Sequence, residues 1–216
     1  MSSDNFVPAL GYDFLTPYYD RVVGLTTREA AFKKALVQQA SIEQHHCVLD
    51  LACGTGTLTI MVKEAAPDVN VIGIDGHRRI LDLARAKASS KLLDIQLDTG
   101  MSFDLPYPDN SFDRVVSSLF FHHLTRTDKI KTLREVKRVL KQNGELHIAD
   151  WGKPSNFLTA IASYSIKMLD GFETAADSFN GLLPGLIKES GFGTVKETGS
   201  FDTIFGTICL YKSIRL

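Results

Sequence analysis

A loop with two glycines follows the first apolar stretch of the chain and has the composition of a ligand-binding turn. Residues 47–51 predict a buried strand, Gly54 and Gly56 turn the backbone, and residues 58–62 continue as a helix. Because glycine has no Cβ, backbone atoms there can touch a ligand, and the unpaired N–H groups of the helix start face it. The pattern therefore predicts a site for a nucleotide-like ligand.

Two carboxylates narrow the choice of ligand. Asp50 stands at the carboxyl end of the predicted strand, where an anion would repel a pyrophosphate and favour a ligand with an ammonium or sulfonium group. Asp75 ends the next predicted strand, about 20 residues after the loop, and is placed to accept both hydroxyls of a ribose. Thr59 occupies the third glycine position of dinucleotide-binding loops, which disfavours a nicotinamide cofactor.

The stretch from Asp50 to Gly56 (Asp-Leu-Ala-Cys-Gly-Thr-Gly) resembles the first motif of class I S-adenosylmethionine-dependent methyltransferases. The pattern Tyr-x-x-x-x-x-Tyr-Tyr-Asp at residues 12–20 is similar to the arm of the quinone-biosynthesis and phospholipid methyltransferases, and the resemblance extends over roughly residues 12–211. It implies methyl transfer from S-adenosylmethionine, leaving S-adenosylhomocysteine, to a small, apolar acceptor. Whether oxygen, nitrogen or carbon accepts the methyl group stays open.

The same resemblance implies a set of cofactor-binding residues. They are Tyr19, Asp50, Ala52, Gly54, Gly56, Asp75, Gly76, Met101, Ser102 and Ser118. Met101 departs from the family pattern, because it replaces an acidic residue that accepts from the adenine amino group, and a thioether accepts hydrogen bonds poorly. We expect adenine recognition to be weaker, or to pass to a neighbouring carbonyl or to Asp98.

Side chains capable of acid–base chemistry follow two later predicted strands. His122 and His123 come after the strand at residues 114–118, and Asp150 ends the strand at residues 145–150. The carboxyl ends of central parallel strands face the ligand crevice, so His122 and Asp150 are the predicted catalytic residues, with Tyr19 a further candidate by position. His123 is expected to pack under the loop. A hydroxyl or carbon acceptor would need a base, whereas an unprotonated amine would not.

Strands and helices alternate along the chain, which predicts a doubly wound, Rossmann-like α/β sandwich. The resemblance implies a seven-stranded, mostly parallel sheet of order 3-2-1-4-5-7-6 with one antiparallel strand. We expect one domain over residues 1–216, with an amino-terminal arm or lid at 1–41 and a substrate cap at 151–191. A helix beginning at Ser155 would either complete the core or form the apolar inner wall of this cap.

Composition sets the limits of function. A net charge of −1 with 44% hydrophobic residues predicts a globular protein without the basic surface that nucleic acids require. The absence of a signal peptide and of an apolar run of about 18 residues favours a cytoplasmic protein without stable membrane insertion. Cys47, Cys53 and Cys209 lack the spacing of metal ligands, so reduced thiols and no metal are expected. Oligomeric state cannot be read from the sequence.

Two other functions are compatible with these motifs. The first is a protein that binds S-adenosylmethionine without transferring its methyl group, which Met101 keeps open. The second is a nicotinamide-dependent reductase, which Thr59 and Asp50 both disfavour.

The departure at Met101 leads to a prediction. Met101→Asp restores a hydrogen-bond acceptor for the adenine amino group, so it is expected to tighten S-adenosylhomocysteine binding in a calorimetric titration. Weaker binding by the variant would show that Met101 does not lie at the adenine position.

Overall fold

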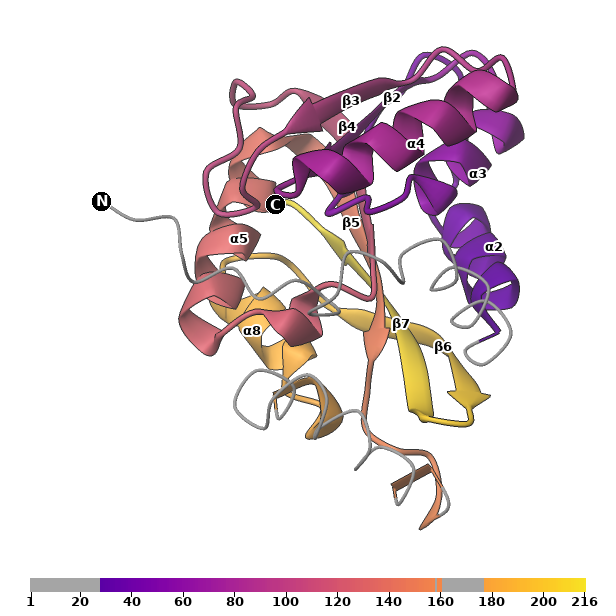
Figure 1. The fold of residues 1–216 in the computed structure, drawn as a ribbon. Helices are drawn as coiled ribbons and strands as arrows, with labels where there is room; N and C mark the ends of the chain where they lie inside the picture. Colours follow the sequence, from indigo (N-terminus) through magenta and orange to yellow (C-terminus); the bar gives the residue numbers. More distant parts are fainter. Residues whose placement is uncertain (1–27, 158, 161–176) are drawn as a thin grey trace.

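Strands and helices alternate in the computed structural model, which describes residues 28–157, 159–160 and 177–216. None of the helices in these ranges is long and apolar enough to cross a membrane. Figure 1 shows the elements, which are α2 (Glu29–Gln39), β1 (Cys47–Leu51), α3 (Thr57–Ala65), β2 (Asn70–Asp75), α4 (Arg78–Ser90), β3 (Gln96–Thr99), β4 (Phe112–Ser118), the short 3-10 helix η2 (Phe121–His123), α5 (Arg126–Val139), β5 (Leu140–Trp151), α8 (Leu183–Glu189), β6 (Lys196–Thr203) and β7 (Gly206–Ile214).

The seven strands form one sheet in the order β3-β2-β1-β4-β5-β7-β6, which confirms the predicted topology. Strands β1 to β5 pair in parallel, and β7 runs antiparallel to both β5 and β6. The parallel pairs bring the carboxyl ends of β1, β2, β4 and β5 to one edge of the sheet, so the loops that follow these strands are neighbours.

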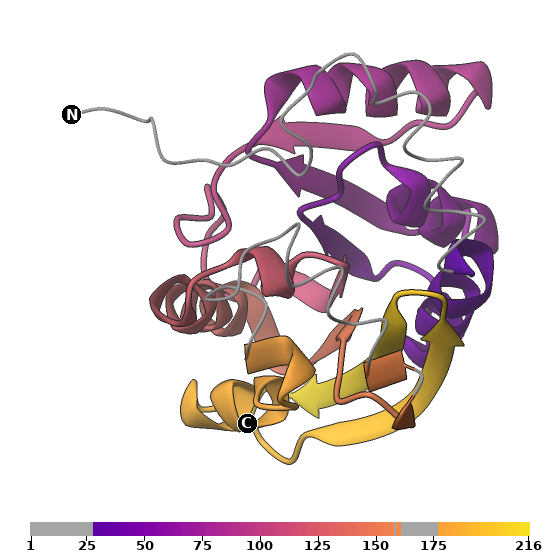
Figure 2. The same cartoon turned by 60° about the horizontal axis from the view of Figure 1, so that its bottom comes forward.

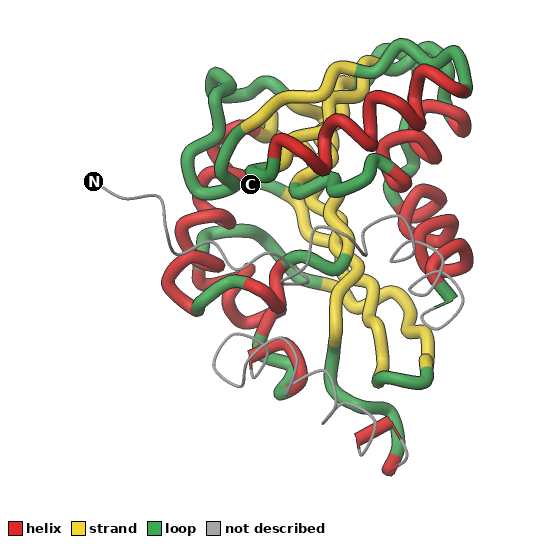
Figure 3. Tube along the Cα trace, viewed as in Figure 1, coloured by secondary structure: helices red, strands yellow, loops and turns green. Residues whose placement is uncertain are grey.

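Two helical layers cover the sheet. Phe32 of α2 and Leu58 of α3 join one buried cluster, while Leu133 of α5 and Leu186 of α8 join the other. Helix α4 packs against the start of α3. Gly56, the residue before α3, lies so close to Ala84 of α4 that an added Cβ would be 3.0 Å from the Ala84 Cβ. The strands run between the layers in Figure 3, and the turned view in Figure 2 keeps the two groups of helices on opposite sides of the strands.

Short side-chain hydrogen bonds fix the ends of two elements. Thr125 caps α5, since its Oγ1 accepts from the Asp128 backbone N–H at 3.2 Å and donates to the Asp128 carboxylate at 2.8 Å. Strand β6 continues to Thr203, because the Thr203 hydroxyl accepts from the Phe205 N–H at 3.1 Å and forms the hairpin turn there.

The predicted cap at residues 151–191 is only partly described. Asn156, not Ser155, caps the helical turn that follows β5, because the Asn156 side-chain oxygen accepts from the Thr159 N–H at 3.0 Å. Most of the predicted cap helix, and the amino-terminal arm with Tyr19, lie outside the described residues.

Helix α4 offers a matched test of which side chains hold it in place. Leu81 and Leu83 are both apolar, but Leu81 is 0% exposed and Leu83 is 39% exposed. Leu81→Ala is therefore expected to lower the free energy of unfolding by about 2–5 kcal/mol, and Leu83→Ala by less than about 1 kcal/mol, in urea titrations. Equal losses would contradict the packing of α4 described here.

Candidate functional site

The loop between β1 and α3 holds an unusual backbone conformation. Ala52, Gly54 and Gly56 all have positive φ, at 56°, 56° and 74°. A Cβ built on Gly54 would meet no protein atom within 4 Å, so the space beside it is open. Backbone strain of this kind gathers at ligand sites. The loop therefore presents backbone atoms to open space, as the two glycines predicted.

Asp75 ties this loop to the start of α4. One carboxylate oxygen accepts from the Gly54 N–H and the other from the His77 N–H, both at 2.9 Å. Burial raises the pKa of Asp75, and the two N–H donors partly offset that rise. The half-buried carboxylate is thus fixed at the carboxyl end of β2, the position predicted for binding a ribose.

A cation that the sequence analysis missed also holds the loop. The Lys87 ammonium on α4 donates to the hydroxyls of Thr55 and Thr57, each at 3.0 Å. A lysine late in an amphipathic helix normally lies in solvent, so its sequence position carries no signal of this contact.

Asp50 is a buried residue of β1, and its side chain faces α3. It is 1% exposed and accepts a 2.6 Å hydrogen bond from the Thr59 hydroxyl. Burial raises the pKa of Asp50 to about 7, against the opposing effects of Thr59 and Lys33. Thr59, at the third glycine position, therefore donates a hydrogen bond to the Asp50 carboxylate. Because its pKa is raised to about 7, Asp50 is only partly ionised at neutral pH.

The residues predicted to bind adenine lie in the segments that follow β2 and β3. Met101 is 38% exposed, and its sulfur lies 3.1 Å from the place a Cβ on Gly76 would occupy. The Ser102 hydroxyl pairs with Thr132 of α5 at 2.8 Å. Asp98, the alternative acceptor for the adenine amino group, accepts from the Tyr107 hydroxyl at 2.9 Å. Tyr107 thus already uses part of the hydrogen-bonding capacity of Asp98.

A histidine–carboxylate pair joins the ends of β4 and β5. His122 Nδ1 lies 2.6 Å from Asp150 Oδ1, and the other Asp150 oxygen accepts from the His122 backbone N–H at 3.2 Å. Asp150 is 0% exposed, and its Oδ1 also accepts from the Trp151 N–H at 2.7 Å. Burial alone would raise the pKa of Asp150, but the charge and hydrogen bond of His122 outweigh it, so the net shift is downward. Asp150 is therefore ionised and fully hydrogen-bonded.

Two further buried bases lie beside this pair. The His123 ring lies against His122, with centroids 3.9 Å apart and the ring planes tilted by 41°, and burial lowers the pKa of His123 to about 3. Lys129 of α5 is 0% exposed; its ammonium donates to the Leu124 carbonyl at 2.8 Å and lies 3.8 Å from Asp177. The sequence analysis missed Lys129, although its i, i+4 and i+7 spacing to Leu133 and Val136 places it on the buried stripe.

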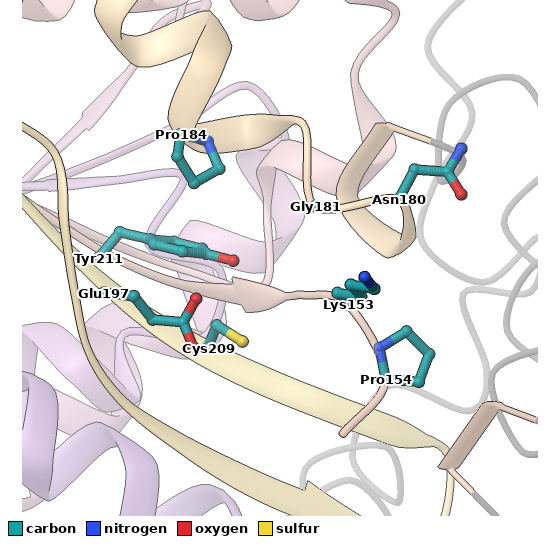
Figure 4. Close-up of a pocket in the computed structure, with 8 residues that line it drawn as sticks. All are labelled: Lys153, Pro154, Asn180, Gly181, Pro184, Glu197, Cys209 and Tyr211. Atoms are coloured by element: carbon teal, nitrogen blue, oxygen red, sulfur yellow. The ribbon is translucent and has the colours of Figure 1, made fainter. Parts of the chain in front are cut away.

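A cavity of about 500 Å³ opens beside the end of β5. Figure 4 shows Lys153 and Pro154 on one side, Pro184 of α8 above, and Glu197, Cys209 and Tyr211 of β6 and β7 along the sheet. This size falls within the usual range for small-molecule sites. Lys153, Pro154 and Pro184 belong to the predicted cap at residues 151–191, whereas no sequence motif pointed to the three side chains on the sheet.

The parallel sheet thus gathers the predicted site residues along one edge. Those of the first loop and of β2 lie together, and Met101 and Ser102 follow β3. Ser118 ends β4, His122 lies in η2 just after it, and Asp150 lies at the end of β5. Tyr19 lies outside the described residues. Within the described residues, no group of three or more His, Cys, Asp or Glu side chains could hold a metal ion.

Comparison with known proteins identifies the family. A family model for a methyltransferase domain matches residues 48–144. The demethylmenaquinone methyltransferase of Lactobacillus johnsonii is 35% identical over 165 residues, which cover 72% of this chain and 67% of that protein. This chain is an S-adenosylmethionine-dependent methyltransferase. The demethylmenaquinone methyltransferase of Deinococcus radiodurans is 37% identical over 147 residues, or 67% of this chain and 60% of that protein. The chain thus matches three-fifths to two-thirds of the length of these relatives.

Solved structures share the fold at lower identity. The YcgJ protein of Bacillus subtilis aligns with a TM-score of 0.67 at 18% identity, covering 84% of this chain and 95% of that one. A SAM-dependent methyltransferase from Aquifex aeolicus aligns with a TM-score of 0.61 at 16% identity, covering 85% and 89%. These likenesses support the methyltransferase sheet order described above.

The residues of the first loop fit the cofactor of this family. The open space beside Gly54 admits a ligand against the backbone, α3 begins without a side-chain cap, and the Asp75 carboxylate lies beside the loop. S-adenosylmethionine is accordingly the cofactor of the methyltransferase.

The burial of Asp50 predicts a pH-dependent stability. Its pKa is higher in the folded than in the unfolded protein, so Asp50 is stabilising when protonated, and this contribution is lost as pH rises from about 4 to about 7. Asp50→Asn removes the ionisation. Relative to the natural protein, the variant is expected to gain about 3 kcal/mol of unfolding free energy across that window, measured by denaturant titration in the absence of cofactor.

Asp68→Asn, which changes an exposed carboxylate, controls for the lost negative charge. A stability difference between Asp50→Asn and the natural protein that did not vary with pH would rule out a buried, proton-binding Asp50.

Proposed function

We propose that this methyltransferase acts on a small hydroxylated aromatic molecule of the quinol type, and that His122 removes a proton from it. The observation that carries the proposal is the 2.6 Å contact of His122 with buried Asp150 at the ends of β4 and β5. The curated relatives are named demethylmenaquinone methyltransferases, which supports an acceptor of this class. A cytoplasmic location and the exclusion of nucleic acid stay predictions.

The cofactor-side residues have separate binding roles in this proposal. When bound, S-adenosylmethionine supplies an activated methyl group on a positively charged sulfur. Asp75 would accept the ribose hydroxyls, the Gly54 loop would contact the ligand through its backbone, and Asp50 would favour the positive methionine end. Gly76 and Met101 would line the adenine. Ala52, Gly56, Ser102, Ser118 and Tyr19 complete the proposed set.

The His122–Asp150 pair would act on the acceptor. A phenolic hydroxyl has a pKa near 10, so the ring or its oxygen is a better nucleophile once that proton is removed. Ionised Asp150 holds the proton on His122 Nδ1, which leaves the proton-accepting role to Nε2, and it stabilises the imidazolium that results. The chain's contribution is then orientation, exclusion of water and removal of one proton.

The two alternatives have less support. A nicotinamide-dependent reductase does not agree with the family assignment or with Thr59 bonded to Asp50. A protein that only binds S-adenosylmethionine would have no use for a buried histidine–carboxylate pair beside a cavity of small-molecule size.

The test is methyl transfer to a reduced dihydroxynaphthalene, followed by mass detection of the methylated product. His122→Ala is expected to lower kcat by about 10²–10⁴-fold at saturating acceptor, the usual contribution of a general base. His123→Ala is the matched control; the pKa of His123 is lowered to about 3 by burial, so it is a poor base and its loss should cost less than about tenfold.

An unchanged kcat in His122→Ala would remove the histidine from the mechanism. Failure of the natural protein to methylate the diol, despite saturable S-adenosylhomocysteine binding, would overturn the proposed acceptor class.

A further inference from the structure

We propose that the cavity beside β5 binds the hydroxylated ring of the acceptor, and that Glu197 and Tyr211 select an acceptor with a free hydroxyl group. This inference rests on the proposed function, and it assigns acceptor binding to two residues that no sequence motif indicated. The cavity, of about 500 Å³, can hold a bicyclic aromatic molecule.

The cavity and the His122–Asp150 pair lie on the same face of the sheet. On β5, Leu146 and Ile148 pack in the cluster with α5 and α8, and strand residues two apart share a face, so Asp150 points to that side as well. Asp150 pairs across the strands with Cys209, which lines the cavity. An acceptor in the cavity would therefore lie next to the proposed base.

A β-bulge places the Glu197 carboxylate at the cavity. Glu197 pairs with Tyr211 and Gly199 with Leu210, so Thr198 between them is the extra residue of the bulge. The Thr198 side chain turns to the other face, where it bonds Gln39 of α2. Bulges re-aim side chains beside functional sites. Here the bulge aims a charged group on an edge strand toward a cavity.

Tyr211 supplies a neutral hydroxyl at the same place. It is 2% exposed, and burial raises its pKa further above the ordinary value, so it remains a phenol that can donate or accept. Figure 4 shows its hydroxyl, the Glu197 carboxylate and the Cys209 thiol directed into one space opposite Lys153. Gly152 keeps that space open, because a Cβ there would lie 3.0 Å from the Tyr211 hydroxyl.

These groups define the ligand chemistry. The Glu197 carboxylate is exposed and can only accept hydrogen bonds, so it favours a ligand that carries a donor. A phenolic O–H is such a donor, and its oxygen can accept from Tyr211 or Lys153. A ring whose oxygens carry methyl groups has no donor for Glu197 and would displace water from the carboxylate without replacing its hydrogen bonds. Pro154 and Pro184 supply apolar surface for the ring.

The proposal predicts which kinetic constant each variant changes. Glu197→Ala is expected to raise the KM for a reduced dihydroxynaphthalene about 10–100-fold, and Tyr211→Phe about 3–10-fold. Glu197→Gln keeps an acceptor and is expected to recover part of the loss. The KM for S-adenosylmethionine and the affinity for S-adenosylhomocysteine should stay within about twofold, which also shows that the variants fold. Glu43→Gln, an exposed glutamate outside the site, is the control.

A binding measurement completes the test. In the presence of S-adenosylhomocysteine, calorimetry should detect the diol but not its dimethyl ether with the natural protein, and Glu197→Ala should abolish that distinction. An acceptor KM within twofold of the natural value in both Glu197→Ala and Tyr211→Phe would overturn this inference and leave the proposed function standing. No methylation of the diol by the natural protein would overturn both.

Discussion

A buried carboxylate must have its hydrogen bonds satisfied within the protein, and Asp150 shows how much of the structure this requires. Its oxygens accept from the ring and backbone of His122 and from the Trp151 N–H, so the turn after β4 is held against the end of β5. The parallel pairing of these strands brings the partners together, with Ser118 opposite Ala149. The sheet topology and the histidine–carboxylate pair thus depend on each other.

Much of this arrangement could be predicted from the sequence, because it follows from local patterns. The apolar run before Gly54 and the carboxylate about 20 residues later predicted the loop, and the alternation of strands with helices predicted the α/β sandwich. The order of the strands came from the resemblance to the methyltransferase family. Placing His122 and Asp150 at strand ends was enough to expect them to be neighbours.

Other features depend on contacts between distant segments and leave no local pattern. Glu197 and Tyr211 meet Lys153 only after β7 has inserted between β5 and β6. Lys87 of α4 likewise contacts Thr55 in the loop and Thr57 at the start of α3. The hydrogen bond from Thr59 to Asp50 also leaves no local pattern, because the sequence shows Thr59 only as a replacement for a glycine. The cap of α5 also leaves no unique local pattern, because Thr125 and Asp128 are both good capping residues and only the backbone decides between them.

The bulge at Thr198 also affects the border of the sheet. A seven-stranded open sheet has two edges with unpaired backbone groups, and such edges can recruit strands from other molecules. At one edge β3 is only four residues long. At the other, β6 is bent by the bulge and carries Lys196, Glu197 and Asp202. The irregularity that aims a carboxylate into the cavity thereby also makes this edge a poor template for intermolecular strand addition.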